Sequence, residues 1–179
     1  AVAETSGIFA LMVAVLLVFG DFSANGVCAW TATMSAGICM GLGALGSGIG
    51  AGYPAQEALW GSARQPALGG QMTTSMLIGQ AVCQTPAIFA LVIAFMLMFK
   101  NCSGLDVWPY GASLIGAGIA MGFGAIGSGW GGGMAGGKAC EGMARQPRLR
   151  SSLTTLMLVG QAVAQTPAIF ALLVAIMLI

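Results

Sequence analysis

Three copies of one short block hold the residues of this chain that could do chemistry in an apolar environment. The copies read AVAETSGIFAL, AVCQTPAIFAL and AVAQTPAIFAL, and they start at positions 1, 81 and 162. The fourth residue is Glu4 in the first copy, Gln84 in the second and Gln165 in the third. A carboxylate in a long apolar stretch is costly and points by default to a functional site. The chain keeps one ionisable group at this position and a neutral isostere at the other two.

A carboxylate followed by a hydroxyl offers hard oxygen ligands, which suit an alkali cation or a proton. In the first block Glu4 and Thr5 are candidate ligands for Na⁺, and the carbonyl of Val2 adds a third oxygen if the helix is locally distorted. The alternative for Glu4 is a headgroup-level residue near a frayed helix end. The other two blocks keep the oxygens and lose the charge, and their candidate ligands are Val82, Gln84, Thr85, Val163, Gln165 and Thr166.

Two prolines, Pro86 and Pro167, follow two residues after each Gln. A proline inside a helix removes one backbone hydrogen bond and bends the helix. Each proline therefore frees a carbonyl near the depth of the Gln, and that carbonyl could be a ligand. A role in helix shape alone is an equal alternative.

The overall composition is that of a membrane protein: 58% of residues are hydrophobic, 6% are charged and the mean hydropathy is +0.91. The net charge of +1 gives no reason to expect a nucleic-acid partner. The chain has no His, and its five cysteines show no CxxC spacing, so we predict no zinc or haem site and no cofactor.

Apolar segments that must position these blocks are separated by short polar stretches. The second and fourth segments exceed 30 residues, and about 30 helical residues reach ~45 Å, beyond the ~30 Å hydrocarbon core of a bilayer. These two helices should therefore project past the membrane on one side. The segments are Glu4–Gly20, Val27–Trp60, Gly69–Lys100, Val107–Met143 and Ser151–Ile179.

The apolar segments form an internal repeat. GLGALGSG recurs as GFGAIGSG, ARQP recurs as ARQP, and GQAVCQTPAIFAL recurs as GQAVAQTPAIFAL, each pair 81 residues apart. The unit is a Gly-rich helix, a polar loop and an apolar helix. The repeat predicts an all-α membrane protein of tandem transmembrane hairpins. It has an extra N-terminal helix over 1–22, a first hairpin over 27–100 and a second over 107–179.

The dense glycines let helix backbones approach closely on more than one side, which favours a ring of helices over a single pair. We therefore expect Gly46→Leu or Gly127→Leu to block ring formation. Five of the six Lys and Arg residues lie in the ARQP loop regions, which places these loops in the cytoplasm.

The first segment departs from the repeat. Glu4 precedes Asp21 by 17 residues and Gln84 precedes Lys100 by 16, so both should lie at one depth. The N-terminal half of such a helix would be missing, with an amino terminus inside the membrane. This pattern has three possible origins: a longer precursor that lost its start, a shifted segment, or a different packing position.

The Gly-rich helix, ARQP loop and A-[EQ]-T helix together resemble the proteolipid c subunit of rotary ATP synthases, over nearly the whole chain. Two fused hairpins resemble the duplicated V-type form, whereas ARQP and GQAxAxT are closer to the bacterial F-type form. The resemblance implies a non-catalytic rotor subunit in a bacterial plasma membrane. It would couple the flow of transported Na⁺ or H⁺ to ring rotation.

This resemblance also implies partners. These are other c subunits in a ring, single-hairpin copies included, with the Gly-rich helices inside, a stator a subunit that receives the ions, the central stalk and membrane lipids. Sodium-specific members carry an inner-helix Gln that would fall at Ala51 and Gly132, and both departures weaken a sodium site. The loops that would touch the central stalk carry Arg64, Gln65, Pro66, Arg145, Gln146 and Pro147.

A Gln cannot take up and release a cation by changing its charge, so each complete hairpin should carry fewer ions, or none. Two other hypotheses stay open at this point. One is a structural ring member without an ion site of its own, in which Glu4 is incidental. The other is an unrelated repeat-built transporter, although the parallel repeat disfavours inverted-repeat types.

Overall fold

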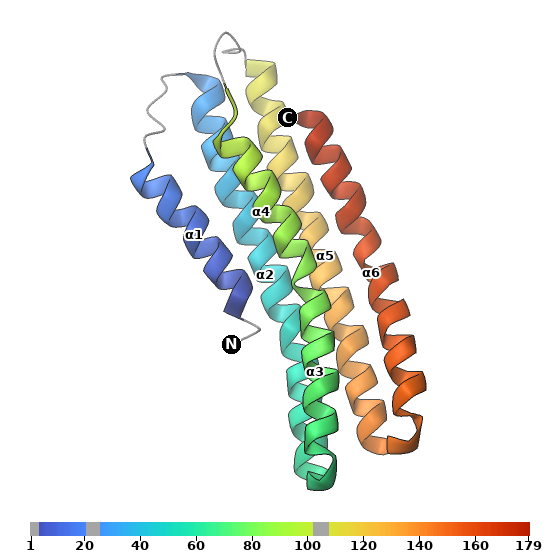
Figure 1. Cartoon of the computed structure of the whole chain (residues 1–179). Helices are drawn as coiled ribbons and strands as arrows, with labels where there is room; N and C mark the ends of the chain where they lie inside the picture. The colour runs from blue at the N-terminus through green and yellow to red at the C-terminus, as the bar shows by residue number, and fades with distance from the viewer. Residues whose placement is uncertain (1–3, 21–25, 102–107) are drawn as a thin grey trace.

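The computed structural model describes residues 4–20, 26–101 and 108–179, and these ranges consist of helices and short connections. Helix α1 (Thr5–Phe19) precedes two long hairpins (Figure 1). The first hairpin comprises α2 (Val27–Arg64), the 3₁₀ turn η2 (Pro66–Leu68), α3 (Gly69–Cys83) and α4 (Thr85–Met98). The second comprises α5 (Trp108–Arg145), η3 (Pro147–Leu149) and α6 (Arg150–Leu178).

The predicted all-α membrane fold is confirmed. Within the described ranges four helical segments are long and apolar enough to cross a membrane, and α1 is a shorter apolar helix. Helices α2 and α5 have 38 residues each, about 57 Å at the helical rise, so they exceed the hydrocarbon core as expected. The spanning segments are Val27–Arg64, Pro66–Met98, Trp108–Arg145 and Pro147–Leu178.

The two Gly-rich helices, α2 and α5, pack against each other along their length. A Cβ atom at Gly50 would collide with the backbone of Gly129, and one at Gly133 would collide with the backbone of Gly50. At Gly129 a Cβ atom would lie 2.7 Å from the Gly46 carbonyl carbon. Only glycine permits this backbone-to-backbone distance, so the repeated glycines determine how closely the two hairpins join.

Each apolar helix packs on the Gly-rich helix of its own hairpin through a matched glycine–alanine contact. A Cβ atom at Gly43 would lie 2.5 Å from the Ala90 Cβ, and the equivalent Gly124 meets Ala171. Helix α4 also contacts α5 and α6, so it packs against both helices of the second hairpin (Figure 1). Ala90 is fully buried as a result.

Helix α1 lies against α2 and also contacts α4 (Figure 1). Ser6 Oγ lies 3.7 Å from the Cβ position of Gly48, and Leu17 Cδ1 lies 3.5 Å from that of Gly37. These two contacts show that α1 runs antiparallel to α2. Val13 in the middle of α1 is buried in the same apolar cluster as α2, α4 and α5.

The register of α1 matches the repeat. One hairpin further along, Cys83 Sγ lies 3.8 Å from the Cβ position of Gly132. In that antiparallel register Pro86 lies level with Gly129. These two residues are the repeat equivalents of Ser6 and Gly48, which meet between α1 and α2. Helix α1 therefore occupies the place of an outer helix that precedes α4, and its carboxylate-bearing block lies at the depth of the two amide-bearing blocks.

Equivalent glycines of the two hairpins differ in how crowded they are. Gly127 is the repeat equivalent of Gly46, and a Cβ atom at Gly46 would collide with Ile126 of the next hairpin. At Gly127 a Cβ atom would meet no described atom within 4 Å. Within one chain only the first of these two glycines is crowded, because Gly127 faces a flank on which no further hairpin is described. The expectation that Gly46→Leu or Gly127→Leu blocks ring formation stays a prediction.

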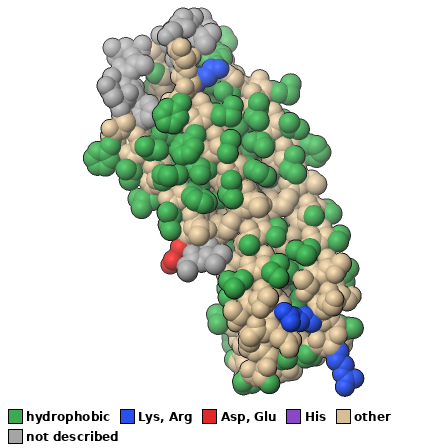
Figure 2. Space-filling view, viewed as in Figure 1, with side chains coloured by type: hydrophobic (Ala, Val, Ile, Leu, Met, Phe, Trp, Pro, Cys, Tyr) green, Lys and Arg blue, Asp and Glu red, His purple; other side chains and the backbone are tan. Residues whose placement is uncertain are grey.

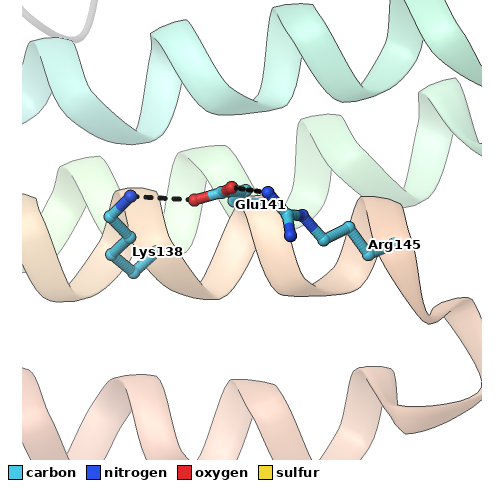
Figure 3. A network of polar contacts seen from close by, with 3 residues as sticks. All are labelled: Lys138, Glu141 and Arg145. Carbon is cyan, nitrogen blue, oxygen red and sulfur yellow. Dashed lines mark hydrogen bonds and ion pairs between the residues drawn. The ribbon is translucent and has the colours of Figure 1, made fainter.

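Figure 2 shows basic side chains at the ARQP end, a further basic patch at the opposite end and an acidic patch between them, with apolar side chains gathered over the half away from the ARQP end. Glu141 forms ion pairs with Lys138, at 2.9 Å, and with Arg145 (Figure 3). The two loops lie side by side, since Gln65 Nε2 donates a hydrogen bond to the Ala144 carbonyl at 3.1 Å. The polar loops thus form one surface at this end of the molecule.

Candidate ion-binding site

A side-chain hydrogen bond joins the two Gln-bearing blocks. Gln165 Nε2 on α6 donates to the Val82 carbonyl at the end of α3, with 3.1 Å between the two atoms. Both amide residues are buried, since Gln165 is 9% exposed and Gln84 is 7% exposed. The position that carries a carboxylate in the first block is therefore one where a side chain reaches a backbone carbonyl of the neighbouring outer helix.

Proline explains why the Val82 carbonyl is available. In a regular helix this carbonyl would accept the N–H of residue 86, but Pro86 has none. Here α3 ends at Cys83 and α4 begins at Thr85. Thr85 Oγ1, in the first residue of α4, donates to the Val82 carbonyl at 2.9 Å. The carbonyl therefore accepts side-chain donors at this depth, and its role as an ion ligand stays a prediction.

The second hairpin repeats half of this arrangement. Thr166 Oγ1 donates to the Val163 carbonyl at 2.8 Å, as Thr85 does to Val82. Val163, however, is 66% exposed and faces the open flank of α6. The structure thus brings Val82, Thr85 and Gln165 together, and it leaves Val163 and Thr166 facing outward from the chain.

The carboxylate-bearing block is described only in part. Glu4 is exposed, Thr5 is half-buried, and Val2 lies outside the described residues. Within the described ranges no three Cys, Asp or Glu side chains gather into a metal-binding group.

A second amide level lies one helical turn from the first, and the sequence patterns considered above did not point to it. Gln161 is fully buried, and its Nε2 atom donates to the Gly79 and Gly132 carbonyls, each at 3.0 Å. Gln80, its repeat equivalent, donates to the Ala51 carbonyl at 3.0 Å. The repetition of GQA in both hairpins was the signal that could have found these residues.

The outer-helix amides reach the inner helices at Ala51 and Gly132, the two positions where the sodium-type pattern would have a Gln. The carbonyls of Ala51 and Gly132 accept hydrogen bonds from Gln80 and Gln161 on the outer helices. At the Gln165 level, the amide nitrogen faces the Val82 carbonyl. In this arrangement the contact between the two hairpins is a hydrogen bond from an amide donor to a carbonyl acceptor.

Most of the loop residues expected to contact the central stalk are on the surface. Arg64, Gln65 and Pro66 are exposed, as are Arg145 and Gln146, and Pro147 is half-buried. The guanidinium of Arg145 is held by Glu141.

Comparison with known proteins agrees with this geometry. The family model for the ATP synthase C subunit matches residues 34–97 and 115–178, one match in each hairpin. The ATP synthase c subunit of Thermotoga maritima is 48% identical over 65 residues, which are 36% of this chain and 76% of that protein. Its namesake in Citrifermentans bemidjiense is 43% identical over 68 residues, 38% of this chain and 75% of that protein.

A further protein of this name, in Petrotoga mobilis, is 47% identical over 66 residues, 37% of this chain and 69% of that protein. The family match rules out the alternative of an unrelated repeat-built transporter. Two matches in tandem agree with the duplicated form that the repeat predicts. The chain belongs to the ATP synthase C-subunit family, the membrane rotor-ring subunits of ATP synthase.

Proposed function

We propose that this rotor-ring subunit carries its transported ion, Na⁺ or H⁺, at Glu4, and that the Gln84 and Gln165 positions carry none. The observation that supports this proposal most directly is the 3.1 Å hydrogen bond from Gln165 Nε2 to the Val82 carbonyl. An amide N–H makes this contact permanently. No ion has to enter or leave for the two outer helices to stay joined.

A carboxylate in the same place behaves differently. Both a carboxylate and a backbone carbonyl are hydrogen-bond acceptors, so they need a proton or a cation between them. Glu4 would therefore reach a carbonyl of the preceding outer helix only when it is protonated or when Na⁺ bridges the oxygens. The Gln165 amide mimics the loaded state of such a site.

The neighbouring helix for Glu4 would come from another ring subunit. Val163 faces outward on the last outer helix, with its carbonyl held by the Thr166 hydroxyl as Val82 is held by Thr85. In a ring of copies this flank meets α1 of the next chain. Glu4 and Thr5 of one copy, with the Val163 carbonyl of another, then supply the oxygen ligands.

Such a ring changes coupling rather than chemistry. Each hairpin still contributes the same rotation, but two of the three outer blocks move no ion past the stator a subunit. The ion-to-ATP ratio falls, which favours ion pumping against a steep gradient over synthesis at a shallow one. The ARQP loops would lie in the cytoplasm and contact the central stalk through Arg64, Gln65, Pro66 and their equivalents Arg145, Gln146 and Pro147.

Carbodiimide labelling of the assembled ring tests this assignment. Carbodiimides react with protonated carboxyls buried in membranes, so each chain should gain one label at Glu4, and Na⁺ should protect that residue if Na⁺ is the transported ion. The Gln165→Glu variant should gain a second label, whereas Gln165→Leu should not.

Two results would overturn the proposal. An unlabelled Glu4 in an assembled ring would favour the structural ring member that has no ion site. Labelling at Glu57 or Glu141 instead would place a membrane-buried carboxyl at the ARQP end of the molecule.

A further inference from the structure

An open cavity of about 320 Å³, lined by both polar and apolar groups, lies between α3 and α6, near the ARQP end of the molecule. It lies nearer the ARQP end of these helices than the Gln-bearing blocks do, and the proposed ion transport does not use it. Helix α3 contributes Ser75 and Ile78 to the lining, and α6 contributes Arg150, Ser151, Thr154 and Thr155.

The cation of this cavity has no carboxylate partner among the described residues. Both ion pairs found in the described part of the chain belong to Glu141, and Arg150 takes part in neither. Arg150 is half-buried at the start of α6. A guanidinium that is partly removed from water and lacks such a partner favours an anionic ligand, above all a phosphate.

Its depth is that of a lipid headgroup. Arg150 precedes Gln165 by 15 residues, about 22 Å along the helix, and Ile179 follows Gln165 by 14 residues. Gln165 thus lies near the middle of α6, and half of a bilayer with its headgroups is roughly 20–22 Å thick. Arg150 falls at the level of the phosphates, and Ile78 offers an apolar surface beside the cavity.

The hydroxyls of the cavity define the headgroup more closely. Thr154 Oγ1, Thr155 Oγ1 and Ser75 Oγ already donate to carbonyls one turn earlier in their own helices. Their oxygen lone pairs remain available as acceptors. A headgroup that carries hydroxyl donors next to its phosphate matches this combination of one cation and several acceptors.

The charge in this lining belongs to the second hairpin only. The second hairpin carries Arg150 and Ser151 where the first carries Gly69 and Gly70. The hairpin fold does not need the charge, since the first hairpin forms the same turn and helix without it. The Arg150 charge is therefore not required for folding, and we look for its role in ligand binding.

We propose that this cavity binds an anionic membrane phospholipid with a glycerol headgroup, of the phosphatidylglycerol class. Arg150 pairs with the phosphate, the hydroxyls of Thr154 and Ser75 accept hydrogen bonds from the headgroup, and Ile78 contacts the acyl region. The lipid fills the space between two outer helices at one place in each chain.

The test compares Arg150→Ala with Arg148→Ala in the full chain assembled into rings. Arg148 is the matched control because it removes the same charge two residues away and does not line the cavity. The rings are reconstituted in phosphatidylcholine vesicles that contain phosphatidylglycerol, re-extracted, and weighed by native mass spectrometry. Loss of one Arg contact at the membrane surface should lower retained phosphatidylglycerol about fivefold in Arg150→Ala, and Arg148→Ala should match the parent.

Two further measurements separate a specific lipid site from poor assembly and from binding of free phosphate. Arg150→Lys keeps the charge and should keep most of the lipid, which guards against a loss caused by poor assembly of the alanine variant. Millimolar inorganic phosphate should not displace the lipid. The proposal is overturned if Arg150→Ala retains as much lipid as the parent, or if both alanine variants lose it equally. Displacement of the lipid by free phosphate would also overturn it, as would a defect in stalk attachment with normal lipid retention.

Discussion

The α2–α5 interface and the α3–α6 interface join the same two hairpins by different means. Between α2 and α5 the backbones touch at Gly50 and Gly129, with no side chain between them. Between the outer helices, Gln165 reaches the Val82 carbonyl through one hydrogen bond. The closest inner contacts are between backbone atoms, whereas the outer contact at this depth uses a side-chain donor that a proton or a cation could replace. Backbone packing thus holds the Gly-rich helices together, and a side-chain hydrogen bond holds the outer helices together at the depth of Gln165.

The strongest way to break the inner interface is Gly46→Leu. A side chain at this position collides with the backbone around Ile126, which cannot move aside as a flexible side chain would. We expect a cost above about 3 kcal/mol and loss of the folded chain. The measurement is the yield of monodisperse protein in mild detergent, together with its thermal unfolding.

The matched control is Gly127→Leu. Because a Cβ atom at Gly127 meets no described atom within 4 Å, this variant should fold as a single chain and fail only when copies assemble. A single-chain fold that is destroyed equally by both substitutions would show that the flank of α5 is not the face that receives the next copy.

Substitution of the second amide level weakens the outer interface less. Gln161→Leu removes two interhelical hydrogen bonds and leaves the carbonyls of Gly79 and Gly132 without this donor. We expect a loss of about 1–3 kcal/mol in unfolding free energy in detergent. Gln80→Leu removes one such bond, to Ala51, and should cost about half as much. Equal costs would mean that Gln161 does not clamp the two hairpins.

The smallest expected effect comes from Pro86→Ala. The new N–H competes for the Val82 carbonyl with Thr85 and Gln165, so the outer hydrogen bond weakens. In a double-mutant cycle the cost of Gln165→Leu should fall from about 1 kcal/mol to a few tenths when residue 86 is Ala. An unchanged cost would show that proline does not set the availability of this carbonyl.

The repeat and its glycines were enough to predict the hairpin fold, because the repeated pattern fixes both the helix lengths and the close backbone contacts. The free carbonyl at Val82 was also predictable, since Pro86 removes its helical donor. The clamp by Gln161 was not, because its acceptors lie 82 and 29 residues away and are backbone atoms of any residue type. The open space at Gly127 escaped prediction for another reason: equivalent residues of a repeat differ at the ends of the array.

The most direct test of the proposed coupling is the threshold ion-motive force for ATP synthesis in enzymes whose rings carry Gln165→Glu. The new carboxyl lies beside the Val82 carbonyl and the Thr85 hydroxyl, where burial favours its protonated form. If the Gln165 position carries no ion in the parent, the variant ring gains one ion per chain in each turn. The ion-to-ATP ratio then rises, and the threshold ion-motive force falls. Gln165→Leu should leave the threshold unchanged. A threshold that is the same in Gln165→Glu and the parent, in rings that assemble normally, would contradict the proposal that the amide positions carry no ion.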